Sequence, residues 1–303
     1  MKTIRSELLG FCSGVRRAVQ SALDALAAGA AAQKPKKIYS LGPLIHNKAA
    51  LDDLQKKGLL ILDENQIEIL DENCAVIVRA HGVSPLVTER IKARGAQVID
   101  ATCPRVALSQ RRAAEFSAKG MFVILAGDKG HAEVKAVEGS ALFPAESSKN
   151  SQNARGSFVL VQNADEAAAL EVLPQMNENA VLLSQTTFAP DEFKKISEIL
   201  SKKISGLKVF DTICPATGQR QKALAALAKK ADALVVVGGK KSANSLRLYE
   251  LAKSLCPRSF FAESAADLPA DFGGAKVVGI AAGASSPDFV IDAVERKIQE
   301  MLV

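Results

Sequence analysis

A repeated five-residue motif constrains the fold of this 303-residue chain more than any other feature. Residues 100–104 read Asp-Ala-Thr-Cys-Pro and residues 211–215 read Asp-Thr-Ile-Cys-Pro. In both copies a glycine that closes an aliphatic run follows the cysteine by 24 residues, and a weaker third copy begins at Cys12. Self-similarity at a regular spacing is typical of chains built from repeated structural units. We therefore expect three similar units.

Polar loops that end in proline repeat in the same way. They lie at residues 80–85, 184–190 and 282–287. The distance from the motif cysteine to this proline is 73 residues in the first and third units and 87 in the second. The excess matches the low-complexity stretch 144–157, whose composition predicts a solvated loop. The three units thus share one plan.

Short aliphatic runs alternate with amphipathic segments between these landmarks. The runs predict buried parallel strands, and the segments predict helices. Expected strands are 75–78, 121–126, 157–161, 180–183, 233–237 and 276–281, and expected helices include 16–28, 106–118 and 220–230. The alternation predicts an α/β fold with mostly parallel sheets and a pseudo-threefold axis. The expected units are 14–103, 104–210, and 211–303 together with 1–13.

Composition and charge exclude several classes of protein. No apolar run reaches the roughly 18 residues that a membrane span requires, and the N-terminal residues do not resemble a secretory signal. Five widely spaced cysteines do not suit a disulfide framework and favour a reducing cytoplasm. The net charge of +6 suits a small anionic ligand, and the lack of Trp disfavours a stacking platform for single-stranded nucleic acid. We expect neither a nucleic-acid nor a membrane partner.

Three of the cysteines are candidate metal ligands. Cys12, Cys103 and Cys214 each precede an expected helix, whose N-terminal amides would favour a thiolate. Thiolates select zinc, cuprous copper or an iron–sulfur cluster, but structural zinc usually has four ligands, often from closely spaced pairs. Three cysteines from distant units suit a [4Fe–4S] cluster with one iron open to a substrate oxygen. Cys74 and Cys256 are expected to be small core residues.

The strand-end loops also collect polar residues that suit an anion. The only three histidines, His46, His81 and His131, all lie in such loops. Equivalent places in the other units hold Thr186, Ser242, Asn244 and Ser285. Imidazoles, hydroxyls and helix N-terminal amides together predict a cage for a phosphate or diphosphate. Glu133 is the one carboxylate in this set, and a carboxyl beside an anion is expected to have a raised pKa and to donate a proton.

The ordered set of motifs resembles one enzyme family. The matching residues are Gly10-Phe11-Cys12-Ser13-Gly14-Val15, His46-Asn47, Ala80-His81-Gly82-Val83, the motif at 100–104, Gly130-His131 with Glu133, Gln185-Thr186-Thr187 and Ala282-Gly283-Ala284-Ser285. In order and spacing they resemble the 4-hydroxy-3-methylbut-2-enyl diphosphate reductases, which catalyse the last step of the methylerythritol phosphate route to isoprenoids. The resemblance runs from residue 10 to about residue 290.

The resemblance implies a fold, a cofactor and a reaction. It implies a trefoil of three α/β domains around one [4Fe–4S] cluster per chain, held by Cys12, Cys103 and Cys214. Glu133 and Thr186 would organise the substrate's hydroxyl end, where the fourth iron binds. Two electrons, from a ferredoxin or flavodoxin type of donor, and two protons would remove water and give isopentenyl and dimethylallyl diphosphate. The implied diphosphate ligands are His46, His81, His131, Ser242, Ala243, Asn244 and Ser285.

Three positions depart from the family pattern, and two other functions stay open. Ala132 replaces a proline, Ala281 replaces a threonine, and Ala243 replaces a serine, so that its backbone N–H is expected to serve the diphosphate. The same cysteines could belong to a cluster-based sensor or electron carrier, although neither needs an anion cage. A zinc-dependent hydrolase or a phosphate-binding protein is the second alternative, and metal analysis distinguishes it.

Overall fold

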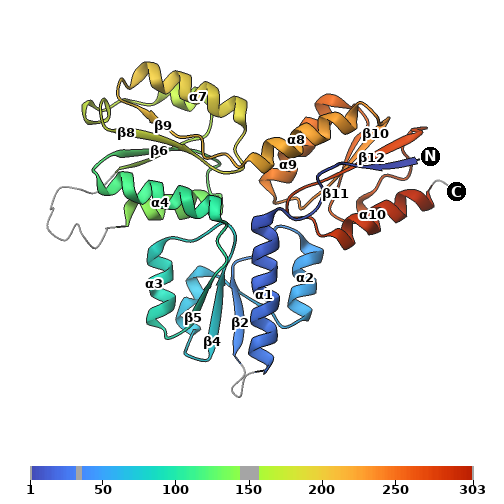
Figure 1. The fold of residues 1–303 in the computed structure, drawn as a ribbon, viewed down its shortest axis with the longest axis horizontal. Coiled ribbons are helices and arrows are strands. Elements are labelled where there is room, and N and C mark those ends of the chain that lie inside the picture. Colours follow the sequence, from blue (N-terminus) through green and yellow to red (C-terminus); the bar gives the residue numbers. More distant parts are fainter. Residues whose placement is uncertain (1, 32–35, 144–156, 302–303) are drawn as a thin grey trace. The chain divides into compact units, whose positions relative to one another are not determined.

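The computed structural model of the chain describes residues 2–31, 36–143 and 157–301, and its strands and helices alternate as the sequence predicts (Figure 1). The predicted loop at 144–157 lies, except for Ser157, outside the described residues. The elements of the first repeat are α1 (Ser13–Ala31), β2 (Lys37–Leu41), α2 (Lys48–Lys56), β3 (Leu60–Leu62), β4 (Cys74–Val78), α3 (Pro85–Ala93) and β5 (Gln97–Asp100).

The second and third repeats follow the same plan. The second consists of α4 (Pro104–Ala118), β6 (Phe122–Ala126), α5 (Ala132–Leu142), β7 (Phe158–Val161), α6 (Ala164–Ala169), β8 (Ala180–Ser184), α7 (Pro190–Lys203) and β9 (Lys208–Val209). The third consists of α8 (Pro215–Ala228), β10 (Ala233–Val237), α9 (Ala243–Leu255), β11 (Ser259–Ala262), β12 (Val277–Ala282) and α10 (Asp288–Glu300), with β1 (Lys2–Arg5) from the other end of the chain.

Strand order repeats in the three four-stranded sheets of the described chain. The orders are β3-β2-β4-β5, β7-β6-β8-β9 and β11-β10-β12-β1. In each sheet the second strand of the repeat is at one edge, followed by the first, third and fourth. The described pairings are parallel. The predicted α/β fold with parallel sheets is therefore confirmed.

The N-terminal residues complete the sheet of the third repeat. Lys2 to Arg5 pair in parallel with Val277 to Ile280, as expected for residues 1–13. The chain divides into two compact units, Met1–Ile61 with Pro215–Val303, and Leu62–Cys214. We refer to them as the first and second units and describe each by itself. The three domain boundaries expected from the sequence stay a prediction.

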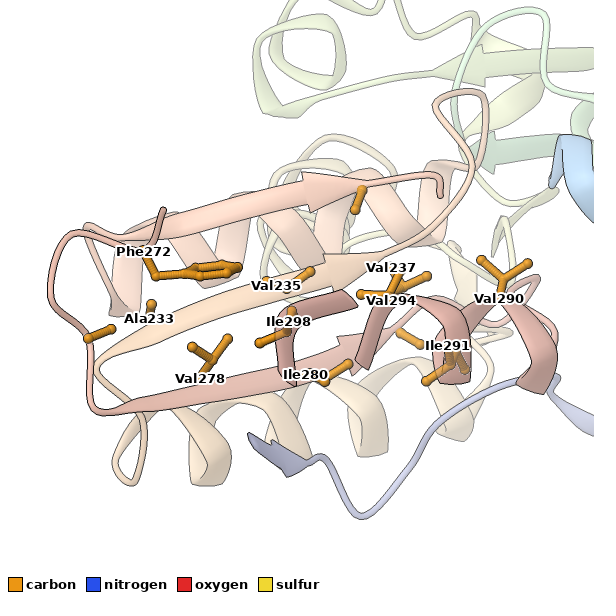
Figure 2. Packing of buried hydrophobic residues seen from close by; sticks show 13 residues of the cluster. Ala233, Val235, Val237, Phe272, Val278, Ile280, Val290, Ile291, Val294 and Ile298 are labelled. Carbon is orange, nitrogen blue, oxygen red and sulfur yellow. The ribbon is translucent and has the colours of Figure 1, made fainter. Parts of the chain in front are cut away.

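The hydrophobic core of the third repeat shows why its sequence folds in this way (Figure 2). Every residue of β10 is buried, as expected of a central parallel strand covered on both faces. On α10 the buried residues Val290, Ile291, Val294 and Ile298 recur at helical spacing and face the strands. Phe272 closes the same cluster. Among the described residues, no helix is long and apolar enough to cross a membrane.

We predict that Ile280→Ala lowers the free energy of unfolding by about 2–5 kcal/mol, because Ile280 of β12 is fully buried in the cluster that contains the apolar residues of α10 and alanine leaves a cavity. Urea unfolding followed by circular dichroism measures this loss. The control is Phe289→Ala on α10, which is 50% exposed and should cost about 1 kcal/mol or less. Equal losses in the two variants would contradict the packing described.

Candidate active site

The three candidate ligand cysteines occupy the same structural position in the three repeats. Each follows the fourth strand of a sheet and immediately precedes a helix. Each backbone N–H donates a hydrogen bond to the carbonyl oxygen that lies two residues beyond the end of the third strand. These bonds join Cys12 to Ala284 (3.1 Å), Cys103 to Ala80 (3.0 Å) and Cys214 to Thr186 (2.8 Å). The internal repeat of the sequence is thus a repeat of local geometry.

The thiols differ in exposure in the way that their predicted roles require. Cys12, Cys103 and Cys214 are partly exposed, whereas Cys74 and Cys256 are buried. The N–H of Val15, in the first turn of α1, donates to the sulfur of Cys12 at 3.5 Å. Partly exposed cysteine sulfurs are accessible to iron, and cysteine is the usual ligand of an iron–sulfur cluster.

The candidate ligands come from both units of the chain. Cys12 belongs to the first unit, and Cys103 and Cys214 belong to the second. Within the described ranges, no group of three or more His, Cys, Asp or Glu side chains lies close enough to hold a metal ion. The gathering of these three thiols around one cluster therefore stays a prediction.

A buried arginine supports the loop that carries Cys12. Arg220 of α8 donates from Nη2 to the carbonyl oxygen of Gly10 at 2.7 Å and from Nη1 to that of Ala282 at 3.2 Å. These bonds fasten the segment before Cys12 to the end of β12. The sequence analysis did not single out Arg220, since its position in an amphipathic helix resembles that of a surface residue.

Glu133 and Thr186, two predicted site residues, are in direct contact in the second unit. Glu133 lies in the first turn of α5 and is 1% exposed. Its Oε1 accepts a hydrogen bond from the backbone N–H of Thr186 at 2.6 Å, and its Oε2 accepts one from the Thr186 hydroxyl at 2.7 Å. A buried carboxyl is thus joined through both oxygens to one threonine, an arrangement that can pass a proton between them.

His131 and His81 lie beside this pair in the same unit. His131 is the N-cap of α5, and its Nδ1 accepts from the backbone N–H of Glu133 at 3.2 Å. In the neutral ring the proton then resides on Nε2, which makes that atom a donor. The rings of His81 and His131 are 5.4 Å apart between centroids and nearly perpendicular, at 79°. The structure therefore brings four of the predicted site residues together.

Gln185, which the sequence analysis quoted only as part of a motif, joins the two loops of this site. Its Oε1 accepts from the N–H of Asp128 at 2.9 Å, and its Nε2 donates to Asp128 Oδ2 at 3.0 Å and to Thr187 Oγ1 at 2.8 Å. Asp128 is in the loop that leads to His131. Because Gln185 and Thr186 are consecutive, the loop after β8 is hydrogen bonded both to Asp128, before His131, and to Glu133, after it.

The remaining predicted residues lie in the first unit, around the start of α9. Ser242 is the N-cap of this helix and is buried, and Ala243 opens it, so that the Ala243 N–H has no helical carbonyl to bind. Ser285 is buried in the loop after β12. The loop of His46 lies against Gly239, where an added Cβ would be 1.8 Å from the His46 carbonyl oxygen. Only glycine permits this approach.

Several buried donors lack an acceptor in the described part of the chain. They are the side-chain nitrogens Asn47 Nδ2 and Asn244 Nδ2 in the first unit and Arg79 Nε in the second. Burial lowers the pKa of Arg79, and Glu64 partly opposes this effect. A buried donor without a partner costs about 1–3 kcal/mol, and an anion rich in acceptor oxygens would remove that cost. Asn47 and Arg79 were not predicted as site residues.

Comparison with known proteins identifies relatives over the full chain. Residues 4–299 match the family described as LytB protein. The 4-hydroxy-3-methylbut-2-enyl diphosphate reductase of Treponema denticola is 42% identical over 98% of this chain and 98% of its own. The protein of the same name from Aquifex aeolicus is 35% identical over 98% of this chain and 96% of its own.

Two solved structures have the same fold. One, described as (E)-4-hydroxy-3-methyl-but-2-enyl diphosphate reductase, the terminal enzyme of the non-mevalonate pathway, is 34% identical, with a TM-score of 0.70 over 99% of this chain and 100% of that chain. The other, from Plasmodium falciparum, has a TM-score of 0.83 over 97% and 87% of the two chains, but at 23% identity it supports the fold alone. The resemblance seen in the motifs is confirmed, and the chain belongs to the LytB protein family.

Proposed function

We propose that this protein reduces (E)-4-hydroxy-3-methylbut-2-enyl diphosphate to isopentenyl and dimethylallyl diphosphate, with loss of water, by means of one [4Fe–4S] cluster per chain. The observation that carries the proposal is the buried pair of Glu133 and Thr186 beside His131. A sensor or an electron carrier has no use for a buried proton donor. The names of the relatives at 35–42% identity support the same reaction.

Cys12, Cys103 and Cys214 would hold the cluster, because they are partly exposed thiols at three equivalent positions before helices. When bound, the cluster supplies electrons and an iron that polarises the allylic C–O bond as a Lewis acid. The electrons would come one at a time from a ferredoxin or flavodoxin type of donor. The free thiols suit a reducing compartment, and we place the protein in the cytoplasm.

The diphosphate would be bound by neutral donors. His46, His81 and His131 offer imidazole N–H groups, Ser242 and Ser285 offer hydroxyls, and the Ala243 backbone and Asn244 offer N–H groups. The buried Asn244 Nδ2 is a hydrogen-bond donor that has no acceptor among the described residues. Neutral donors at a helix N-terminus can bind an anion without the desolvation cost of a buried cation.

The proton for the leaving hydroxyl would pass through Thr186. In the structure the threonine hydroxyl donates to Glu133 Oε2. When that oxygen binds a proton, the hydrogen bond reverses, and the hydroxyl proton of Thr186 becomes free to move to the departing oxygen. The carboxyl proton then replaces it on the threonine. Glu133 thus acts as the general acid, and the backbone N–H of Thr186 holds its other oxygen in place.

We predict that Cys12→Ser, Cys103→Ser and Cys214→Ser each lose the cluster and the activity, because a hydroxyl is a poor substitute for a thiolate on iron. Iron and sulfide content with visible absorption, after anaerobic purification, measures this loss. Cys256→Ala, which removes a buried thiol, is the control and should retain both the cluster and the activity. Zinc in the wild-type protein in place of iron would favour the hydrolase alternative.

We predict that Glu133→Gln slows turnover by about a hundredfold or more while cluster content is unchanged, because glutamine keeps the shape but has no proton to deliver. Steady-state reduction of the allylic diphosphate under anaerobic conditions measures the rate. The matched control is Glu138→Gln on the same helix, which should stay within about twofold of wild type. A Glu133→Gln enzyme that works at the wild-type rate with a full cluster would remove Glu133 from the mechanism.

A further inference from the structure

Ser245, in the first turn of α9, is enclosed between two glycines and is fully buried. A Cβ added at Gly283 would lie 2.0 Å from the Ser245 hydroxyl oxygen, and one added at Gly238 would lie 2.4 Å from the Ser245 Cβ. Gly238 directly follows β10 and Gly283 directly follows β12, its parallel neighbour. The Ser245 side chain therefore occupies the space beside the ends of two central strands, and any residue larger than glycine at position 238 or 283 would collide with it.

The enclosed hydroxyl fixes the polarity of the neighbouring Ser242. The hydroxyl of Ser245 donates to Ser242 Oγ at 3.0 Å, and the N–H of Ser245 donates to the same oxygen at 3.3 Å. A hydroxyl oxygen has two acceptor sites and one proton. Since both acceptor sites of Ser242 are filled, its proton must point to a third group. No residue in the described part of the chain accepts that proton.

We propose that Ser245 is a positioning residue that holds Ser242 as a pure hydrogen-bond donor toward the diphosphate of the substrate. This inference rests on the proposed function and adds to it a residue that does not touch the ligand. The oxygens of a diphosphate are anionic acceptors, so a hydroxyl that can only donate matches them and makes a stronger, charge-assisted hydrogen bond to them than to a neutral oxygen. Ser242 therefore contributes to selectivity as well as to affinity.

The neighbouring residue makes this orientation more important. Ala243 has no side-chain donor and the Ser245 hydroxyl is engaged with Ser242, so Ser242 supplies the hydroxyl that can bind an anion at the start of α9. Without the Ser245 hydroxyl, Ser242 has a vacant acceptor site and can turn its proton elsewhere. The anion would then lose a preorganised donor and would have to order it on binding.

The test is Ser245→Ala, which removes one oxygen and needs no new space. Inorganic pyrophosphate binding to the cluster-loaded enzyme, measured by calorimetry, is expected to weaken by about tenfold, the scale of one hydrogen bond. KM for the allylic diphosphate should rise by a similar factor, while kcat stays within about twofold. Ser254→Ala, an exposed serine on the same helix, is the control and should change neither quantity.

A double-mutant cycle separates this inference from the proposed function. If Ser245 acts through Ser242, the double variant should bind pyrophosphate no more weakly than Ser242→Ala alone. Additive losses would overturn the inference, as would normal binding by Ser245→Ala when Ser242→Ala is weakened. Normal binding by both single variants would instead show that the start of α9 does not hold the diphosphate. Thermal unfolding of each variant identifies any loss of binding that comes from damage to the fold. A fall in kcat at unchanged KM would also contradict the positioning role.

Discussion

A single backbone hydrogen bond, made once in each repeat, connects the fold to its chemistry. It runs from the N–H of a cysteine to the carbonyl oxygen two residues beyond the third strand of the same sheet. The bond brings the start of one helix next to the loop that precedes another. Because Thr186 supplies the carbonyl for Cys214 and binds Glu133 through its N–H and hydroxyl, one residue links a candidate ligand to the candidate proton donor. A shift in the sheet register would move both.

The buried polar atoms of the site differ in whether they have hydrogen-bond partners, and the difference follows the roles proposed for the residues. Glu133 is enclosed and both of its oxygens are hydrogen bonded, which offsets the cost of burying a carboxyl. Asn47, Asn244 and Arg79 instead keep a nitrogen without an acceptor among the residues that the structure describes. These buried donors lower the stability of the free protein, and a ligand rich in oxygen atoms would supply the missing acceptors on binding. Such a protein is expected to be more stable with its substrate than without it.

The sequence predicted the central strands well, because their burial on both faces produces a pattern that edge strands do not have. A central strand such as β10 is a continuous aliphatic run because both faces are covered. The edge strand β9 has two residues, both exposed, and leaves no such signal. The three predicted ligand cysteines and the histidines follow strands, as the repeat predicted, and Glu133 lies in the first turn of α5, while their roles stay a prediction. Gln185 and Arg220 could not be recognised, since their contacts lie far along the chain, 57 residues away for Gln185 with Asp128 and 210 for Arg220 with Gly10.

The position of β1 has a consequence for the order in which the protein can fold during synthesis. The ribosome makes β1 long before its partner β12, because the other described strands lie between them in the chain. Until then the N-terminal strand has an unpaired edge, and the loop of Cys12 lacks the carbonyl of Ala284 that fixes it. The sheet β7-β6-β8-β9 can form earlier, because all of its strands have already been made. Contacts between distant chain segments form slowly, so the N-terminal strand is the part of the nascent chain most exposed to wrong pairing.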